Sequence, residues 1–261
     1  MSLSSVLLTS LGAVLVLMIG AWILSLIREK ACVADSFWGI GFVLIAWLAW
    51  SMGPGTSRSL LVAVLISIWG LRLFSHVTLR NWGQPEDRRY MAMREHHGRR
   101  FWWFSLFSVF LLQGILIWII SLAPQLAQMS PVPARLTWID GLGLFIWAVG
   151  FTFEAVGDYQ MNRFRSNPAN AGKVMDKGLW GYTRHPNYFG ESLVWWGIFI
   201  IALATPYGWW GLISPVLITV LLLKVSGVAM MEKDISQRRP DYEKYRREVS
   251  VFVPWFRARD G

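Results

Sequence analysis

The chain has a single cysteine, Cys32, and only four histidines among its 261 residues. One cysteine cannot form a disulfide within the chain, and it cannot build a cysteine metal cluster. The histidines are scattered and include no pair at a spacing typical of zinc ligands. We therefore expect no bound metal.

Long polar segments are also missing. The longest ones, 80–101, 158–186 and the tail from 232, run to roughly 30 residues at most, which is too short for an independent hydrophobic core. The chain has no internal repeat and no low-complexity tract. The sequence therefore predicts one domain over 1–261.

Apolar residues are abundant instead. They make up 54% of the chain, include 17 tryptophans and give a mean hydropathy of +0.41, whereas a soluble domain has roughly 45–50% apolar residues. Runs long enough to cross a bilayer as helices recur at 3–27, 36–52, 57–79, 102–122, 136–157, 187–204 and 208–231. The sequence predicts an all-α polytopic membrane protein with about seven transmembrane helices.

The basic residues indicate how these helices are oriented. No basic residue precedes the first run, and the run leads into Arg28 rather than a small-residue cleavage site, so it should stay as the first helix. When the N-terminus is placed outside, Arg58 and Arg135 are the only basic residues between the predicted spans that fall on the outer side. The positive-inside rule then predicts a cytoplasmic C-terminus. Topology and anionic lipids account for the net charge of +9, so we expect membrane lipids and no nucleic acid as partners.

The motif GYTRHPNYFGE interrupts the apolar sequence before the sixth run. Pro186 suits the first position of a helix, and the helix N-terminus with Arg184 and His185 predicts an anion-binding site. Asn187 and Glu191 lie four residues apart and share a helix face. Ionisable residues within a membrane are costly and usually functional. The alternative is that the basic residues before Pro186 are only an interfacial anchor.

The fifth run ends with a second polar stripe. Glu154 and Asp158 are four residues apart, and Arg165 follows seven residues after Asp158. A cytoplasmic ion pair between Asp158 and Arg165 is the alternative to a binding role. Lys173 and Lys177 end the flexible loop that follows, and this loop suits a lid over a phosphorylated ligand.

Weaker candidates lie in the tail and in the first half. The tail should form an amphipathic cytoplasmic helix that Pro254 ends, with Tyr245 as a ligand contact or as part of a surface resting on headgroups. Asp35 and Tyr90 are candidate general acids, each near the cytoplasmic end of a span. The alternative role for Asp35 is to cap its helix. Asp87 is a further polar residue of the loop before Tyr90, and its plainer role is a loop ion pair with Arg88 or Arg89.

With these motifs in place, the chain resembles the membrane family that includes steroid 5-alpha reductases and C14 sterol reductases. It looks closest to a branch of that clan catalogued as a domain of unknown function. The similar segments are DSFWGIGF, WGLRLFSHVTLRNWGQPEDRRY, DYQMNRFR, GLWGYTRHPNYFGE and the tail E…DYEKY…FVPWF, which begins with a glutamate.

The resemblance implies an NADPH site in a cofactor half over 136–261. Asn187 and Glu191 would address the nicotinamide, and Asp158 and Arg165 would bind farther along the dinucleotide. The candidate cofactor-binding residues are Glu154, Asp158, Arg165, Lys173, Tyr182, Arg184, His185, Asn187, Tyr188, Glu191, Tyr245 and Arg246, and the candidate catalytic residues are Tyr90 and Asp35.

The sequence therefore predicts an integral membrane reductase with a cytoplasmic active face, in the inner membrane if the chain is bacterial. It would reduce a carbon–carbon double bond in a lipophilic steroid-, sterol- or enone-lipid-like substrate. Isoprenylcysteine-type methyltransferases are similar in their RHP helix start and tail, and they imply S-adenosylmethionine as the alternative cofactor. A non-catalytic membrane scaffold is the third hypothesis. The amide of Asn187 beside Glu191 favours the reductase.

Overall fold

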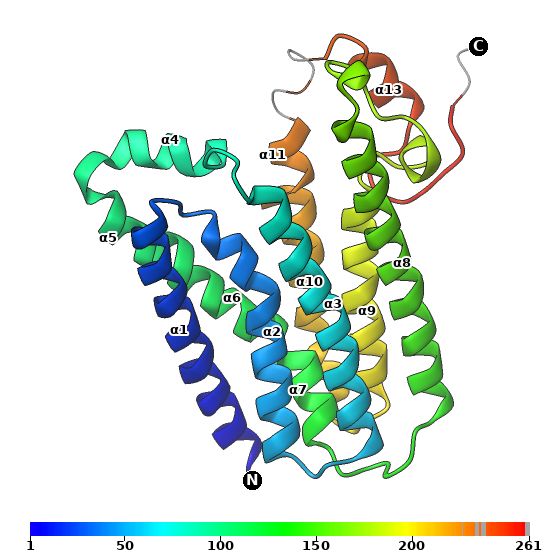
Figure 1. The fold of residues 1–261 in the computed structure, drawn as a ribbon. Coiled ribbons are helices and arrows are strands. Elements are labelled where there is room, and N and C mark those ends of the chain that lie inside the picture. The colour runs from blue at the N-terminus through cyan, green and yellow to red at the C-terminus, as the bar shows by residue number, and fades with distance from the viewer. Residues whose placement is uncertain (226, 233–234, 236–238, 259–261) are drawn as a thin grey trace. The chain divides into compact units, whose positions relative to one another are not determined.

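The computed structural model describes residues 1–225, 227–232, 235 and 239–258. The regular secondary structure of these residues is helical (Figure 1), apart from one isolated parallel bridge between Thr183 and Ser250. The chain forms two compact units, which we call the N-terminal unit (1–137 and 201–214) and the C-terminal unit (138–200 and 215–261). The prediction of a single domain stays a prediction.

Six helices in the described part of the chain are long and apolar enough to cross a membrane: Leu3–Arg28, Val33–Met52, Ser57–Asn81, Arg88–Ile120, Trp138–Ser166 and Gly208–Glu232. The prediction of an all-α, multi-pass membrane protein is confirmed. The remaining predicted run is also a helix, α9 (Pro186–Leu203). It is not among the six, because the polar residues of its first turns lower its hydropathy.

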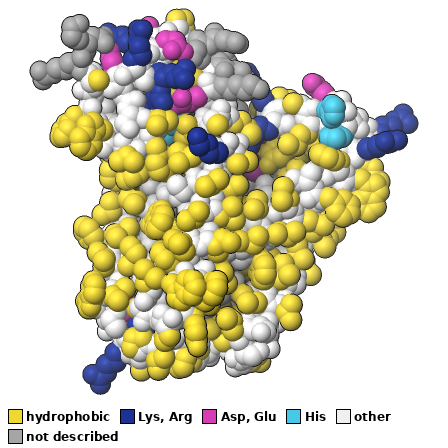
Figure 2. Space-filling view, turned by 180° about the vertical axis from the view of Figure 1, so that it is seen from behind, with side chains coloured by type: hydrophobic (Ala, Val, Ile, Leu, Met, Phe, Trp, Pro, Cys, Tyr) yellow, Lys and Arg dark blue, Asp and Glu magenta, His cyan; other side chains and the backbone are white. Residues whose placement is uncertain are grey.

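The helix surfaces match this assignment. Figure 2 shows one face on which hydrophobic side chains cover the helices, while Lys and Arg side chains lie toward the helix ends. Only 28% to 39% of the most apolar window of each of the six helices is buried within the protein. Such apolar, outward-facing surface is stable in lipid rather than in water.

The N-terminal unit consists of α1 (Leu3–Arg28), α2 (Val33–Met52), α3 (Ser57–Asn81), α4 (Arg88–His97), α5 (Phe101–Ser105), α6 (Leu112–Ile120) and α7 (Leu122–Met129). Side chains of Ser2, Thr56 and Asp87 accept backbone N–H bonds and begin α1, α3 and α4. Glycines bring α2 and α3 together, since a Cβ on Gly70 would lie 2.7 Å from the carbonyl oxygen of Gly39. Membrane helices pack through such small residues.

Arg58 has a structural role at the end of this unit that faces away from α4. It is 1% exposed, and its guanidinium donates to the carbonyl oxygens of Pro133 at 2.9 Å and Arg135 at 3.3 Å. The charge of Arg58 is therefore used to hold the segment before α8. This leaves Arg135 as the exposed basic residue on the predicted outer side.

The C-terminal unit contains α8 (Trp138–Ser166), most of α9, most of α10 (Ile213–Val220), the short π-helix Leu221–Val225, α11 (Val228–Glu232) and α13 (Tyr242–Glu248). Glycines again allow backbone contact between α8 and α9. A Cβ on Gly150 would lie 2.6 Å from the carbonyl oxygen of Gly190, and one on Gly197 would lie 2.6 Å from the backbone nitrogen of Trp147. This contact fixes the start of α9 against the last turns of α8.

The predicted tail helix is shorter than expected, and part of its predicted range, 233–234 and 236–238, lies outside the described residues. The helix ends at Glu248 and not at Pro254, so the predicted stop is wrong. The physical reason is a competing contact, because Val249 turns extended and Ser250 pairs with Thr183 beside the RHP motif.

Candidate functional site

The tail holds the segment that leads into α9. Arg184 N donates to the carbonyl oxygen of Ser250 at 2.9 Å, and Thr183 Oγ1 donates to that of Phe252 at 2.8 Å. The α9 helix begins at Pro186, as predicted. These two bonds hold the residues just before α9 against the tail, and the Arg184 and His185 side chains project from this segment.

These two side chains converge on one carboxylate. Glu232 Oε1 lies 2.9 Å from His185 Nε2 and 3.2 Å from Arg184 Nε, and it accepts a hydrogen bond from the Tyr242 hydroxyl at 3.0 Å. Arg184 and His185 are 8% and 5% exposed. The Arg184 Nε–H is not aimed at the carboxylate, so this contact is an ion pair rather than a hydrogen bond. We call Arg184, His185, Glu232 and Tyr242 the Glu232 cluster.

Two buried tyrosines border this cluster. Burial first, and then the Glu232 carboxylate, raise the pKa of Tyr242 above its ordinary value. Burial and the neighbouring Tyr242 likewise raise the pKa of Tyr245, whose hydroxyl donates to the carbonyl oxygen of Trp180 at 2.6 Å. Both tyrosines are therefore neutral hydrogen-bond donors at physiological pH.

At the second residue of α9, Asn187 meets the acidic stripe of α8. Its side-chain nitrogen donates to Asp158 Oδ1 at 3.1 Å. Gly157 makes room for this approach, since a Cβ there would lie 3.3 Å from Asn187 N. The amide oxygen of Asn187 is buried and accepts no hydrogen bond from the part of the chain that the structure describes. A ligand N–H group is the natural partner for such an oxygen.

Three further predicted residues lie near these groups. Glu154 is 2% exposed, and its backbone packs against Gly190 of α9. Glu191 is partly buried one turn beyond Asn187. The ring of Tyr188 is parallel to that of His185, with centroids 5.5 Å apart and planes at 8°.

Other predicted cofactor residues have exposed side chains. Tyr182 and Arg165 are exposed, and the exposed Arg246 side chain lies 3.8 Å from Glu243 while its carbonyl oxygen accepts from Arg184. Lys173 lines a pocket on a different face of α8. The cationic groups expected around one ligand are thus spread over several surfaces.

The sequence interpretation included the tail motif with its glutamate and paired tyrosines in the resemblance, but it named neither Glu232 nor Tyr242 as a candidate site residue. The signal that could have indicated Glu232 is an acid at the end of the last apolar run, where the positive-inside rule favours lysine and arginine.

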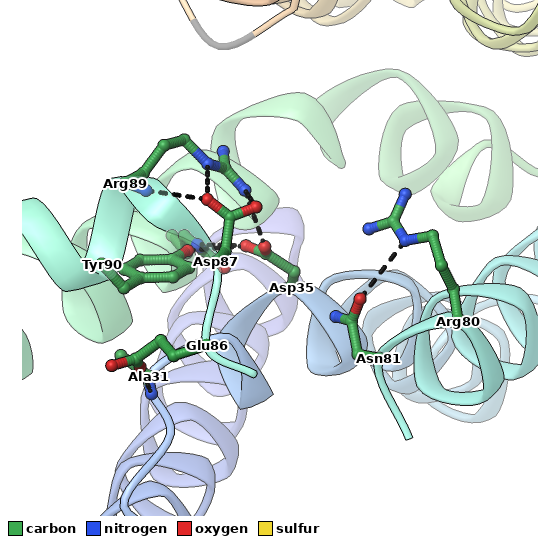
Figure 3. A network of polar contacts seen from close by, with 9 residues as sticks. Ala31, Asp35, Arg80, Asn81, Glu86, Asp87, Arg89 and Tyr90 are labelled. Carbon is green, nitrogen blue, oxygen red and sulfur yellow. Dashed lines mark hydrogen bonds and ion pairs between the residues drawn. The ribbon is translucent and has the colours of Figure 1, made fainter. Parts of the chain in front are cut away.

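A second polar network lies in the N-terminal unit and contains both predicted catalytic residues (Figure 3). Asp35 Oδ1 accepts a hydrogen bond from the Tyr90 hydroxyl at 2.7 Å, and Oδ2 pairs with Arg89 at 3.0 Å. Cys32 occupies the cap position of α2, so Asp35 is not the helix cap. The alternative ion pair of Asp87 with Arg89 is present at 2.9 Å. A catalytic role for Asp35 and Tyr90 stays a prediction.

The rest of this network fixes the loop before α4. Burial alone would raise the pKa of Asp87, but hydrogen bonds from Arg89 outweigh it and hold the pKa below its ordinary value. Glu86 accepts a bond from the backbone nitrogen of Ala31 and pairs with Arg94 at 3.1 Å. The loop is therefore tied to the start of α2 by charged contacts.

The fold and the buried polar groups define a multi-pass membrane protein with a charged cluster at the start of one helix. The chain belongs to the DUF1295 family, which is described as a protein of unknown function, and the match covers residues 21–249. The resemblance to a branch of unknown function is therefore confirmed at the level of this family.

Two relatives extend the comparison. Methanethiol S-methyltransferase 1 of Bradyrhizobium diazoefficiens is 24% identical over 241 residues, which cover 85% of this chain and 77% of that protein. An uncharacterized protein of Schizosaccharomyces pombe is 21% identical over 249 residues, which cover 84% of this chain and 67% of that protein. No solved structure matches the chain. Neither relative carries the name of a reductase, so the predicted reductase class has no support from them.

Proposed function

We propose that the chain is an S-adenosylmethionine-dependent membrane methyltransferase that methylates a small or lipophilic thiol. The distant relative named methanethiol S-methyltransferase supports the reaction class and suggests sulfur as the acceptor atom. The RHP helix start, which resembles that of isoprenylcysteine-type methyltransferases, supports the same cofactor.

The observation that carries this proposal is the charge balance around the start of α9. S-adenosylmethionine has a sulfonium, an ammonium and one carboxylate, whereas NADPH has a pyrophosphate and a 2′-phosphate. At this helix start Asp158 contacts Asn187 and Glu232 contacts His185, the backbone of Glu154 packs against Gly190 one turn farther on, and the cation Arg184 is paired with Glu232. Burial strengthens charge interactions, so an acid-rich site favours the cationic ligand over the polyanionic one.

Each part of the ligand has a chemically suitable group. The N-terminus of α9 with His185 suits the methionine carboxylate, and Asp158 suits the ammonium. The buried amide oxygen of Asn187 can accept a hydrogen bond from a ligand N–H group. The parallel rings of His185 and Tyr188 offer a flat surface beside the helix start.

In the reaction, the acceptor sulfur forms a bond to the methyl carbon as the bond from that carbon to the sulfonium breaks. The thiol proton goes to a carboxylate or to water, and the products are a thioether and S-adenosylhomocysteine. The protein contributes by holding the two sulfur atoms and the methyl group in line, and by excluding water. A thiol that partitions into the membrane reaches such a site from the lipid side, and the donor enters from the cytoplasm.

The NADPH-dependent reductase is the second candidate, and one observation favours it. Asn187 with Asp158 forms an amide–carboxylate pair that suits the carboxamide of nicotinamide. The dispersed positions of Lys173 and Arg165 weigh against the phosphates of that cofactor.

The experiment is a transfer assay with the full-length protein purified in mild detergent. S-adenosylmethionine labelled in its methyl group is incubated with methanethiol, with longer alkanethiols and with a prenylated cysteine analogue. We expect label in a methyl thioether, activity lost in Glu232→Gln, and activity retained in the exposed control Glu243→Gln. NADPH oxidation by an enone lipid, without methyl transfer to any acceptor, would replace the proposal with the reductase.

A further inference from the structure

A pocket of about 800 Å³ lies beside the last turns of α8 in the C-terminal unit. Its lining includes Val156, Tyr159, Arg163 and Phe164 of α8, together with the loop over 167–177. Pockets of this size accommodate small organic ligands. None of the residues of the Glu232 cluster lines it.

The loop is tied back onto α8, so the pocket is a built feature. Gln160 Oε1 accepts a hydrogen bond from Leu179 N at 3.0 Å, and Asn170 Nδ2 donates to the carbonyl oxygen of Phe164 at 2.9 Å. Gly178 has φ +61°, and a Cβ there would lie 2.6 Å from the Gln160 side chain. A glycine at this turn thus allows the loop to close.

Helix geometry separates this pocket from the candidate methyl-donor site. Successive residues of an α-helix turn by about 100°, so Val156 and Arg163 lie on roughly the opposite side of α8 from Glu154 and Asp158. One helix therefore presents an acidic stripe on one face and a cationic pocket on another.

The polar side chains of the pocket give it a positive charge. Arg163, Lys173 and Lys177 line it, and its acid, Asp176, pairs with Arg257 at 3.3 Å. Arg257 also donates to Glu248 at 2.7 Å, which keeps it beside the loop. Because Asp176 already has a cationic partner, the three lining cations attract an anionic ligand.

Aromatic residues indicate the depth of the pocket in the membrane. Trp138 and Tyr159 are 77% and 62% exposed on α8. At 1.5 Å per residue they are about 32 Å apart along the helix, close to the roughly 30 Å of a hydrocarbon core. Trp and Tyr concentrate at the two membrane interfaces. Val156 then faces the acyl chains, and Arg163 lies at the level of the headgroups.

We propose that this pocket binds an anionic phospholipid, independently of the proposed methyl transfer. The phosphodiester is held by Arg163, Lys173 and Lys177, and the upper part of an acyl chain lies against Val156. The cations and the apolar lining of the pocket together favour an anionic phospholipid over a free phosphate, because a free phosphate has no apolar group to lie against Val156.

The experiment measures lipid binding to the full-length protein in detergent by native mass spectrometry. We expect one phosphatidylglycerol to bind at least about tenfold more tightly than phosphatidylcholine. The triple variant Arg163→Gln, Lys173→Gln, Lys177→Gln should lose this preference. The control variant Arg88→Gln, Arg99→Gln, Arg100→Gln removes the same charge from exposed positions of the N-terminal unit and should retain it.

Three outcomes would overturn the proposal. If both triple variants lose the preference for phosphatidylglycerol equally, the lipid is attracted by the net charge of the protein and not by this pocket. Displacement of the lipid by millimolar inorganic phosphate would make free phosphate the ligand, and displacement by S-adenosylmethionine would make this pocket the cofactor site. A further variant, Val156→Trp, fills the apolar part without changing charge and should weaken phosphatidylglycerol binding if the acyl chain enters the pocket.

Discussion

Replacing Glu232 with alanine should destabilise the C-terminal unit strongly, because three side chains contact this carboxylate. Arg184 Nε and His185 Nε2 lie 3.2 and 2.9 Å from Oε1, and the Tyr242 hydroxyl lies 3.0 Å from it. Arg184 is 8% exposed, so the variant leaves a buried guanidinium without its counter-charge. Breaking a buried ion pair from one side costs about 3–5 kcal/mol, and the lost hydrogen bond from Tyr242 costs about 1 kcal/mol.

A double-mutant cycle separates the charge effect from lost packing. Removing both charges, as in Glu232→Met with Arg184→Met, should be less destabilising than Glu232→Ala, because no unpaired charge stays buried. Unfolding of the purified variants is followed by tryptophan fluorescence and circular dichroism during titration with a denaturing detergent. If the free energy of unfolding of Glu232→Ala is within about 0.5 kcal/mol of the wild-type value, the Glu232 cluster does not stabilise the fold as described. Strictly additive effects of the two single methionine variants would mean the same.

Three further outcomes follow from the structure. Because the folded-state pKa values of Tyr242 and Tyr245 are raised, the unfolded tyrosines ionise first above pH of about 10. Stability is therefore complete below that pH and falls above it, and the Tyr242→Phe, Tyr245→Phe variant should show a smaller alkaline loss in the same unfolding titration. In Gly190→Ala the added Cβ would overlap the backbone of α8, so the variant should lose about 1–3 kcal/mol of stability and melt at a lower temperature. In the control Gly141→Ala the added Cβ has no atom within 4 Å, so its melting temperature should match that of the wild type. A C-terminal fluorescent-protein fusion should be bright and an alkaline phosphatase fusion inactive, and the reverse result would overturn both the predicted span count and the cytoplasmic placing of the site.

Much of the helical architecture was predictable from local sequence. Each apolar run that the hydropathy indicated is a helix in the structure, because twenty or so apolar residues leave a membrane segment few other ways to satisfy its backbone. Pro186 marked the start of α9 for an equally local reason. The end of the tail helix was not predictable in this way, since it depends on the pairing of Ser250 with Thr183.

The candidate site was predictable only where its residues are neighbours on one helix. Glu154 and Asp158 form a stripe that spacing alone predicts. The contact between His185 and Glu232 joins residues 47 positions apart, and the contact between Asp35 and Tyr90 joins residues 55 positions apart. Spacing carries no information on such contacts, which depend on how the helices pack. The same limit explains why Lys173 was grouped with Arg184, although it lines a separate pocket.

The most direct test of the account is ligand stabilisation of the purified, full-length protein. A ligand that binds only the folded state stabilises it by RT ln(1 + [L]/Kd), about 2.7 kcal/mol at a hundredfold excess over Kd. We predict that S-adenosylmethionine raises the melting temperature of the wild type, that the increase is lost in Glu232→Gln, and that NADPH at the same concentration produces none. An increase with NADPH and none with S-adenosylmethionine would contradict the methyltransferase assignment, and no increase with either ligand would favour a membrane scaffold.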